Sequence, residues 1–111
     1  MTPDFEKVHR NPVNLVIHII AVPLFVICMV SAVWMLASGK VLVSLLLLLG
    51  PLLSLAVQGL GHRMEAVPPE PFHGPADFVR RIFREQFYGF WVFVFSGSWS
   101  KTIKAARQRG N

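Results

Sequence analysis

Three histidines and one glutamate in this sequence are residue types that hold a divalent metal ion. His9 and His18 lie near the start of the chain, whereas His62 and Glu65 follow more than forty residues later. Neutral imidazole is the commonest protein ligand for such metals, and a carboxylate lowers the net charge of a site. Histidines with one carboxylate and open positions are typical of non-haem iron(II) centres. The same set suits zinc that activates water, and spacing alone does not separate the two metals.

The segments that must position these residues are strongly apolar. Of 111 residues, 53% are hydrophobic and 15% charged, the net charge is +5 and the mean hydropathy is +0.50. Val13 to Ala37 contains no Asp, Glu, Lys or Arg, and Val41 to Gly61 follows after a short break at Ser38-Gly39-Lys40. Each run is long enough to be a transmembrane helix, and so short a connection predicts an antiparallel hairpin.

The hairpin places distant histidines at one depth. His18 lies 21 residues before Gly39, and His62 lies 23 residues after it. At about 1.5 Å rise per residue, both stand roughly 30–35 Å from the turn. His9 comes just before a helix start at Asn11-Pro12. It can therefore fold over the end of the hairpin where His18 and His62 lie. We therefore predict His9, His18, His62 and Glu65 as metal ligands, with Glu65 a fourth ligand or a base.

Two amides lie one helical turn before the histidines of the hairpin. Asn14 precedes His18 by four residues, and Gln58 precedes His62 by four. Residues at this spacing share a helical face, so either amide is a candidate to hold the free imidazole nitrogen from the second shell. Cys28 is the only cysteine, which excludes an internal disulfide.

The sequence from Pro68 onward predicts a region that lies at the membrane–water interface. A proline-rich stretch from Pro68 to Pro75 precedes a helix from about Ala76, which has aromatic residues on one face and charged residues on the other. The aromatic segment 87–95 is too short to span a bilayer and should pack on the hairpin, and the tail from Ser100 should be helical to about Arg107. The charged face carries Arg80, Arg81 and Arg84, which either anchor the chain on anionic lipid or bind a substrate carboxylate.

These elements predict an all-α fold of about four helices in one membrane-embedded domain, residues 1–111. It comprises a hairpin of two transmembrane helices, an interfacial amphipathic helix and an aromatic C-terminal helix. Basic residues flank both ends of the hairpin, which predicts an integral membrane protein with both termini in the cytoplasm. The membrane would be the inner membrane of a bacterium or the endoplasmic reticulum of a eukaryote. We expect no nucleic-acid partner, while a homo-oligomer would shield the buried polar groups better.

Several short motifs resemble those of one family of small membrane proteins, formerly a domain of unknown function. Its characterised member is the iron-dependent 2-hydroxy-fatty-acid dioxygenase of the pathway from phytosphingosine to odd-numbered fatty acids. The resemblance covers nearly the whole chain, and His73 matches no motif position. The motifs, in order, are His9-x-Asn11-Pro12-x-Asn14-x-x-x-His18, Gly61-His62-x-x-Glu65, Pro68-Pro69-x-Pro71-Phe72 and Glu85-Gln86-Phe87.

The resemblance implies an Fe(2+) site on His9, His18 and His62, with Glu65 at the acidic position. It also implies that dioxygen shortens a 2-hydroxy fatty acid by one carbon, an alpha-oxidation at the membrane. The leading hypothesis is therefore an iron(II)-dependent dioxygenase acting on a fatty-acyl or similar lipid. Two alternatives remain open, namely a zinc-dependent lipid hydrolase on the same ligands and a non-catalytic hairpin that binds lipid or a partner helix.

Overall fold

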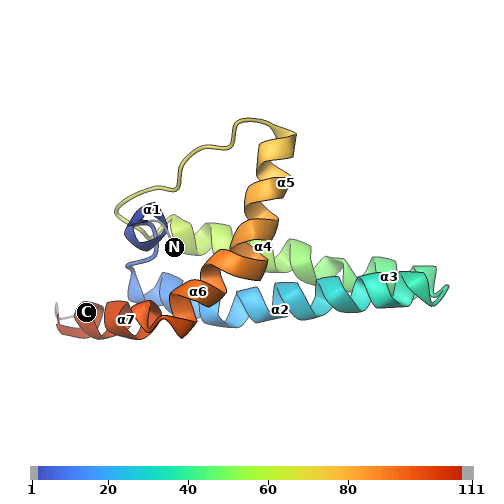
Figure 1. Ribbon diagram of the computed structural model, residues 1–111, viewed down its shortest axis with the longest axis horizontal. Coiled ribbons are helices and arrows are strands. Elements are labelled where there is room, and N and C mark those ends of the chain that lie inside the picture. Colours follow the sequence, from blue (N-terminus) through green and yellow to red (C-terminus); the bar gives the residue numbers. More distant parts are fainter. Residues whose placement is uncertain (1–2, 109–111) are drawn as a thin grey trace.

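The computed structural model describes residues 3–108, and this part of the chain is helical without any strand. The predicted all-α fold is confirmed. Figure 1 shows a long hairpin with a shorter helical arm crossing it near the middle. The elements are α1 (Pro3–Lys7), α2 (Pro12–Ala37), α3 (Val41–Leu47), α4 (Leu49–His62), α5 (Pro75–Arg84), the π-helix η1 (Glu85–Gly89), α6 (Phe90–Phe95) and α7 (Ser98–Gln108).

The hairpin consists of α2 packed against α3 and α4. Asn11 caps α2, because its side-chain oxygen accepts hydrogen bonds from the backbone N–H groups of Val13 and Asn14 at 2.9 and 3.3 Å. α2 continues through Pro23, and Gly39, with φ +80, forms the turn. The predicted second span is interrupted at Leu48, because Pro51 has no N–H to continue the helical bonding.

Serine hydroxyls join the two arms of the hairpin. The Ser44 hydroxyl donates to the Ala32 carbonyl at 2.7 Å, and the Ser54 hydroxyl donates to the Ala21 carbonyl at 2.5 Å. Both serines are buried, and small residues of this kind let apolar helices approach closely. These two bonds fix which residues of the arms face each other.

The hairpin keeps most of its apolar surface exposed. α2 and the combined segment Val41–His62 are 26 and 22 residues long, and the best 18-residue windows have mean hydropathies of 2.7 and 2.3. Only 28% and 22% of those windows are buried, whereas the core helix of a soluble protein is mostly buried. Both helices are long and apolar enough to span a membrane.

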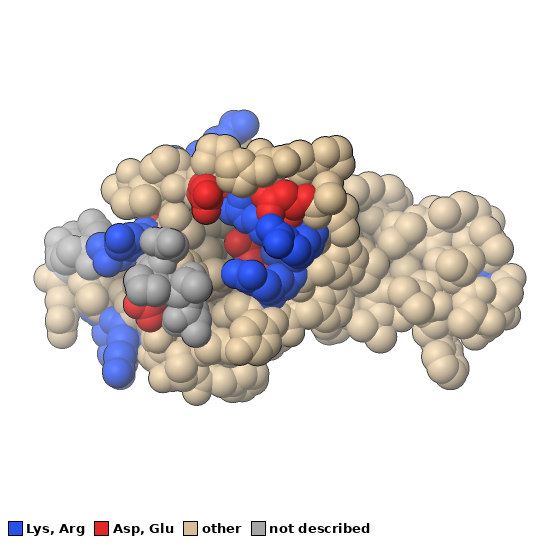
Figure 2. Space-filling view, turned by 45° about the horizontal axis from the view of Figure 1, so that its top comes forward, with Lys and Arg blue, Asp and Glu red and all other residues tan. Residues whose placement is uncertain are grey.

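The aromatic C-terminal segment packs on the base of the hairpin, as predicted. Phe90 and Phe93 of α6 form a buried cluster with Leu15 and Val22 of α2. The Trp99 indole N–H of α7 donates to the Leu15 carbonyl at 3.0 Å. Helix α1 was not predicted, and it lies over the same base (Figure 1). Charged side chains gather over the region of α5 and its preceding loop, while the far arm of the hairpin is almost wholly uncharged (Figure 2).

A pair of buried glutamines attaches η1 to the hairpin. Gln58 of α4 and Gln86 of η1 exchange amide hydrogen bonds at 2.9 and 2.8 Å, and the Gln58 amide also donates to the Ser54 hydroxyl at 2.9 Å. Both glutamines are almost fully buried. A π-helix often marks a functional or strained position, and here it accompanies the inward placement of Gln86.

We expect Gln58→Leu to lower the free energy of unfolding by about 1–3 kcal/mol, because it leaves the buried Gln86 amide without a partner. The double variant Gln58→Leu/Gln86→Leu should cost less than the sum of the two single variants, since no orphaned amide remains. Denaturant titration in detergent micelles measures all three values. Additive costs would show that the pair contributes no coupling.

Candidate metal centre

Three histidine rings converge at the base of the hairpin, where α1, α2 and α4 meet. The ring centroids of His9, His18 and His62 are 4.8, 4.7 and 4.8 Å apart, and the three interplanar angles lie between 78° and 86°. One ring nitrogen from each lies within 4.8 Å of the others. His9 and His18 are only 2% and 3% exposed. The predicted convergence of these three side chains is therefore confirmed.

Backbone carbonyls orient two of the rings. Nδ1 of His9 lies 2.6 Å from the Phe5 carbonyl oxygen, and Nδ1 of His18 lies 3.0 Å from the Asn14 carbonyl oxygen. A carbonyl only accepts, so each Nδ1 carries the hydrogen and each Nε2 keeps a free lone pair. Metal-binding histidines characteristically donate their other ring N–H in this way. The Phe5 ring also stacks on His9, with the centroids 4.1 Å apart.

The third ring is held less firmly. The Val8 carbonyl is the backbone neighbour of the His62 ring, but Nδ1 of His62 is buried without a hydrogen bond of normal geometry among the described residues. Val8 also accepts a long hydrogen bond, 3.4 Å, from the Asn14 amide. Small adjustments of the His62 ring are therefore the cheapest way to fit an ion between the three rings.

Burial keeps His9 in the form that binds metal. Desolvation lowers the pKa of His9 well below its usual value, and the neighbouring His18 and His62 lower it further. The hydrogen bond to Phe5 acts in the opposite direction but is the smallest of these influences. At neutral pH this ring is therefore uncharged, and its lone pair is available to a metal.

The three rings offer one nitrogen each, and these nitrogens lie within 4.8 Å of one another. They could hold one divalent ion and would leave further coordination positions open. A set of three neutral histidines does not select between iron and zinc, because both metals accept imidazole ligands.

Glu65, predicted as a fourth ligand or a base, does not join this group. Its carboxylate accepts the backbone N–H groups of Arg10 and Asn11, with all four N–O distances between 2.9 and 3.0 Å, and the Asn14 amide at 2.6 Å. The cause is that α4 ends at His62, so Glu65 follows in a turn rather than on the helical face of His62. In the structure, the Glu65 carboxylate lies at the N-terminus of α2, where a negative charge is stabilised by the helix dipole.

The two predicted second-shell amides have other partners. The Asn14 side chain binds Glu65 and Val8, and only its backbone carbonyl contacts the His18 ring. Gln58 pairs with Gln86 instead of with a histidine. A Cβ added at Gly61 would collide with the side-chain amide oxygen of Asn14, so Gly61 permits the close approach of α4 to α2. The sequence did not reveal Phe5, although its spacing of four residues before His9 was a usable signal.

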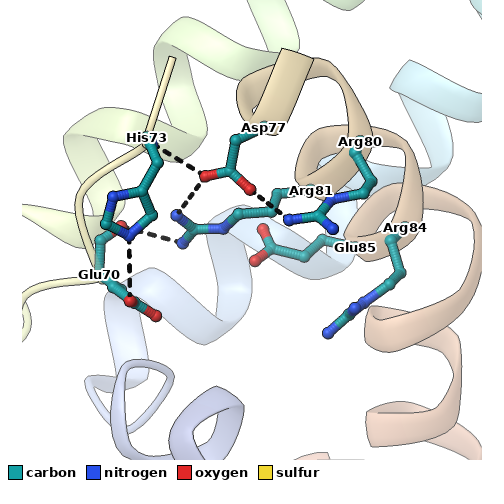
Figure 3. A pocket seen from close by; sticks show the side chains of 7 residues that line it. All are labelled: Glu70, His73, Asp77, Arg80, Arg81, Arg84 and Glu85. Carbon is teal, nitrogen blue, oxygen red and sulfur yellow. Dashed lines mark hydrogen bonds and ion pairs between the residues drawn. The ribbon is translucent and has the colours of Figure 1, made fainter. Parts of the chain in front are cut away.

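The three predicted substrate-binding arginines line a separate polar pocket of about 230 Å³, which contains none of the three metal-centre histidines. Figure 3 shows their side chains among acidic neighbours. Arg80 binds Asp77 at 2.6 Å, and Arg81 donates to the carbonyls of Glu70 and Pro71 at 2.9 and 3.1 Å. Among residues 3–108, no hydrogen bond or ion pair holds the guanidinium of Arg84. These contacts favour a structural role for Arg80 and Arg81.

Comparison with known proteins found no matching family model, no matching curated protein and no matching solved structure. The resemblance to the dioxygenase family therefore stays a prediction that rests on the motif residues. The metal centre itself rests on the geometry of His9, His18 and His62.

Glu65→Gln should separate a structural anion from a metal ligand. We expect the free energy of unfolding to fall by about 2–3 kcal/mol, because a carboxylate that accepts hydrogen bonds from three N–H donors is replaced by a neutral amide. Metal bound per folded molecule, measured by mass spectrometry, should not change. Glu70→Gln is the matched control, since the Glu70 side chain is 73% exposed and should cost at most about 0.5 kcal/mol. Loss of metal at unchanged stability would restore Glu65 as a ligand.

Proposed function

We propose that this chain is a membrane-bound, iron(II)-dependent dioxygenase that shortens 2-hydroxy fatty acids by one carbon. The observation that carries the proposal is the triangle of three imidazoles, of which those of His9 and His18 are buried and fixed with Nε2 free. Three neutral histidines with open positions would hold a divalent ion such as iron(II) or zinc. The motif resemblance favours iron(II).

The open positions fit the substrate class. A ferrous ion held by His9, His18 and His62 would supply the redox chemistry with dioxygen, and its open positions would admit the hydroxyl and carboxylate of a 2-hydroxy acid. His9, His18 and His62 are neutral ligands, so they leave the positive charge of the site uncompensated. An anionic carboxylate is therefore attracted to the site, and Glu65 does not compete for it because its oxygens are bonded elsewhere.

Aromatic side chains limit the access of water to the centre. Phe5 stacks on the His9 ring, and the Phe90 and Phe93 rings lie 6.0 and 5.9 Å from the rings of His18 and His9. Phe90 and Phe93 are fully buried. Aromatic side chains that exclude water in this way strengthen electrostatic interactions inside the site and protect reactive species from side reactions.

The overall reaction balances without a further reductant. The bond between C1 and C2 of the acid breaks, C2 gains an oxygen atom and becomes the new carboxyl carbon, and C1 leaves as carbon dioxide. The remaining oxygen atom leaves as water, so one molecule of dioxygen accepts all the electrons that the acid loses.

An apolar groove provides room for the acyl chain of such a lipid. Its volume is about 410 Å³, and it lies between the outer half of α2 and the aromatic residues of α5 and η1. The groove is lined by Met29, Val30, Val33, Trp34, Ala37, Phe83 and Phe87.

The direct test is metal analysis of protein purified in detergent without chelator and loaded with ferrous iron under anaerobic conditions. We expect one iron per chain for the wild type. His18→Ala and His62→Ala should each lower the affinity for iron by at least about 100-fold, since even outer-shell changes cost 10–100-fold. His73→Ala is the matched control, because this exposed histidine lies in the polar pocket and should leave binding unchanged.

Oxygen uptake then distinguishes the three hypotheses. On addition of a 2-hydroxy fatty acid, the iron-loaded wild type should consume oxygen and release an acid shorter by one carbon, whereas the two histidine variants should not. A zinc hydrolase would bind zinc in preference and consume no oxygen. A hairpin without catalytic function would bind no metal at all, and this result would end the proposal.

A further inference from the structure

The depth at which this hairpin enters a membrane is limited by helix α5. Phe25 of α2 contacts Phe83 and Phe87, with ring centroids 6.2 and 6.1 Å apart. Phe25 lies twelve residues before Ala37, where α2 ends. At about 1.5 Å rise per residue, α5 and η1 therefore meet the hairpin only about 18 Å from its tip.

This contact point divides a charged region from an uncharged arm. The polar pocket beside it contains Asp77, Arg80, Arg81, Arg84 and Glu85. Figure 2 shows basic and acidic side chains clustered over the body of the molecule. Beyond Phe25, residues 26–52 contain a single charged residue, Lys40 in the turn. The exposed side chains of this arm are large and apolar, among them Trp34, Leu42 and Leu49 at 69%, 70% and 60% exposure.

The arm is too short to cross a bilayer while α5 stays in water. The hydrocarbon core is about 30 Å thick, whereas the arm and its turn extend about 20 Å beyond the charged region. An upright hairpin that crossed completely would draw the arginines and acidic residues of α5 into the hydrocarbon. These charged groups would then lie about 10 Å inside the hydrocarbon, where burying several charges is costly.

A second charged level lies at the base of the hairpin. Trp99 fixes α7 beside Leu15, and α7 carries Lys101, Lys104 and Arg107. Leu15 is about 15 Å further from the tip than Phe25, so a membrane surface that touches both charged levels is inclined to the hairpin axis. The face of α2 turned away from Phe25 is apolar and exposed, with Val13, Val16 and Ile20 at 51%, 46% and 66% exposure.

We infer that the hairpin is inserted obliquely and that its turn, residues 38–40, ends inside the bilayer instead of crossing it. The binding partner is the lipid bilayer, in which the hairpin occupies one leaflet and the adjoining part of the second. The charged face of α5 lies at the lipid headgroups. The stem of Lys40 extends from the turn toward the far headgroups, which reduces the cost of its charge. This inference does not depend on the metal or on the dioxygenase activity.

Thiol labelling in sealed lipid vesicles tests the inference. Cys28→Ala removes the only cysteine, and Ser38→Cys then places one thiol in the exposed turn. A membrane-impermeant maleimide should label this thiol at least about tenfold more slowly than a His73→Cys thiol, from either side of the vesicle, because thiolate forms only in water. Detergent should abolish the difference.

The other outcomes are equally informative. Labelling of the turn only from the side opposite to His73→Cys would show that the hairpin crosses, and rapid labelling from the same side would show that it does not insert. Either result would overturn the inference. A nitroxide on Ser38→Cys gives a second measurement, in which collision with oxygen should exceed collision with a water-soluble nickel complex, as expected inside hydrocarbon. The reverse order would also overturn it.

Discussion

The carboxylate of Glu65 is the interaction on which the arrangement at the base of the hairpin depends. It accepts the N–H groups of Arg10 and Asn11 and the amide of Asn14, so it joins the end of one helix to the start of the other. The Asn11 amide returns a bond to the Met64 carbonyl at 3.1 Å. An anion at a helix N-terminus also compensates the unpaired donors there. Because His9 and His62 flank these contacts, the same bonds bring the three imidazoles together.

The metal centre is then completed by backbone groups rather than by side chains. The carbonyls of Phe5 and Asn14 determine which nitrogen of His9 and His18 faces the centre, and both lie four residues before the histidine that they orient. Residues four apart share a helical face, so the backbone carbonyl can orient the histidine ring and no additional side chain is needed. This arrangement also explains how a chain with so few polar residues orients ligands without a dedicated second shell.

The sequence predicted the parts of this site that follow from helix length. Two uncharged runs with a three-residue break determine a hairpin, and counting from Gly39 brings His18 and His62 to one level. The direction of Glu65 could not be predicted in this way, because it depends on α4 ending at His62. The partner of Gln58 was equally inaccessible, since Gln86 lies 28 residues later in a π-helix that no periodicity indicates. Helix α1, which carries Phe5, has only five residues, so the spacing of Phe5 and His9 was the one signal that it left in the sequence.

The same division between charged base and apolar arm links the site to the membrane. The three histidines lie on the terminal side of Phe25, with His18 about 10 Å further from the tip, and therefore near the level at which charged residues stop. A 2-hydroxy fatty acid has its polar end at that level when its chain lies in the bilayer. The acid would therefore reach the imidazoles without leaving the lipid phase, while the groove beside α2 receives its chain. A hairpin that stops inside the bilayer would be sufficient for the proposed function, because that function requires the centre at the membrane surface and no connection between the two sides.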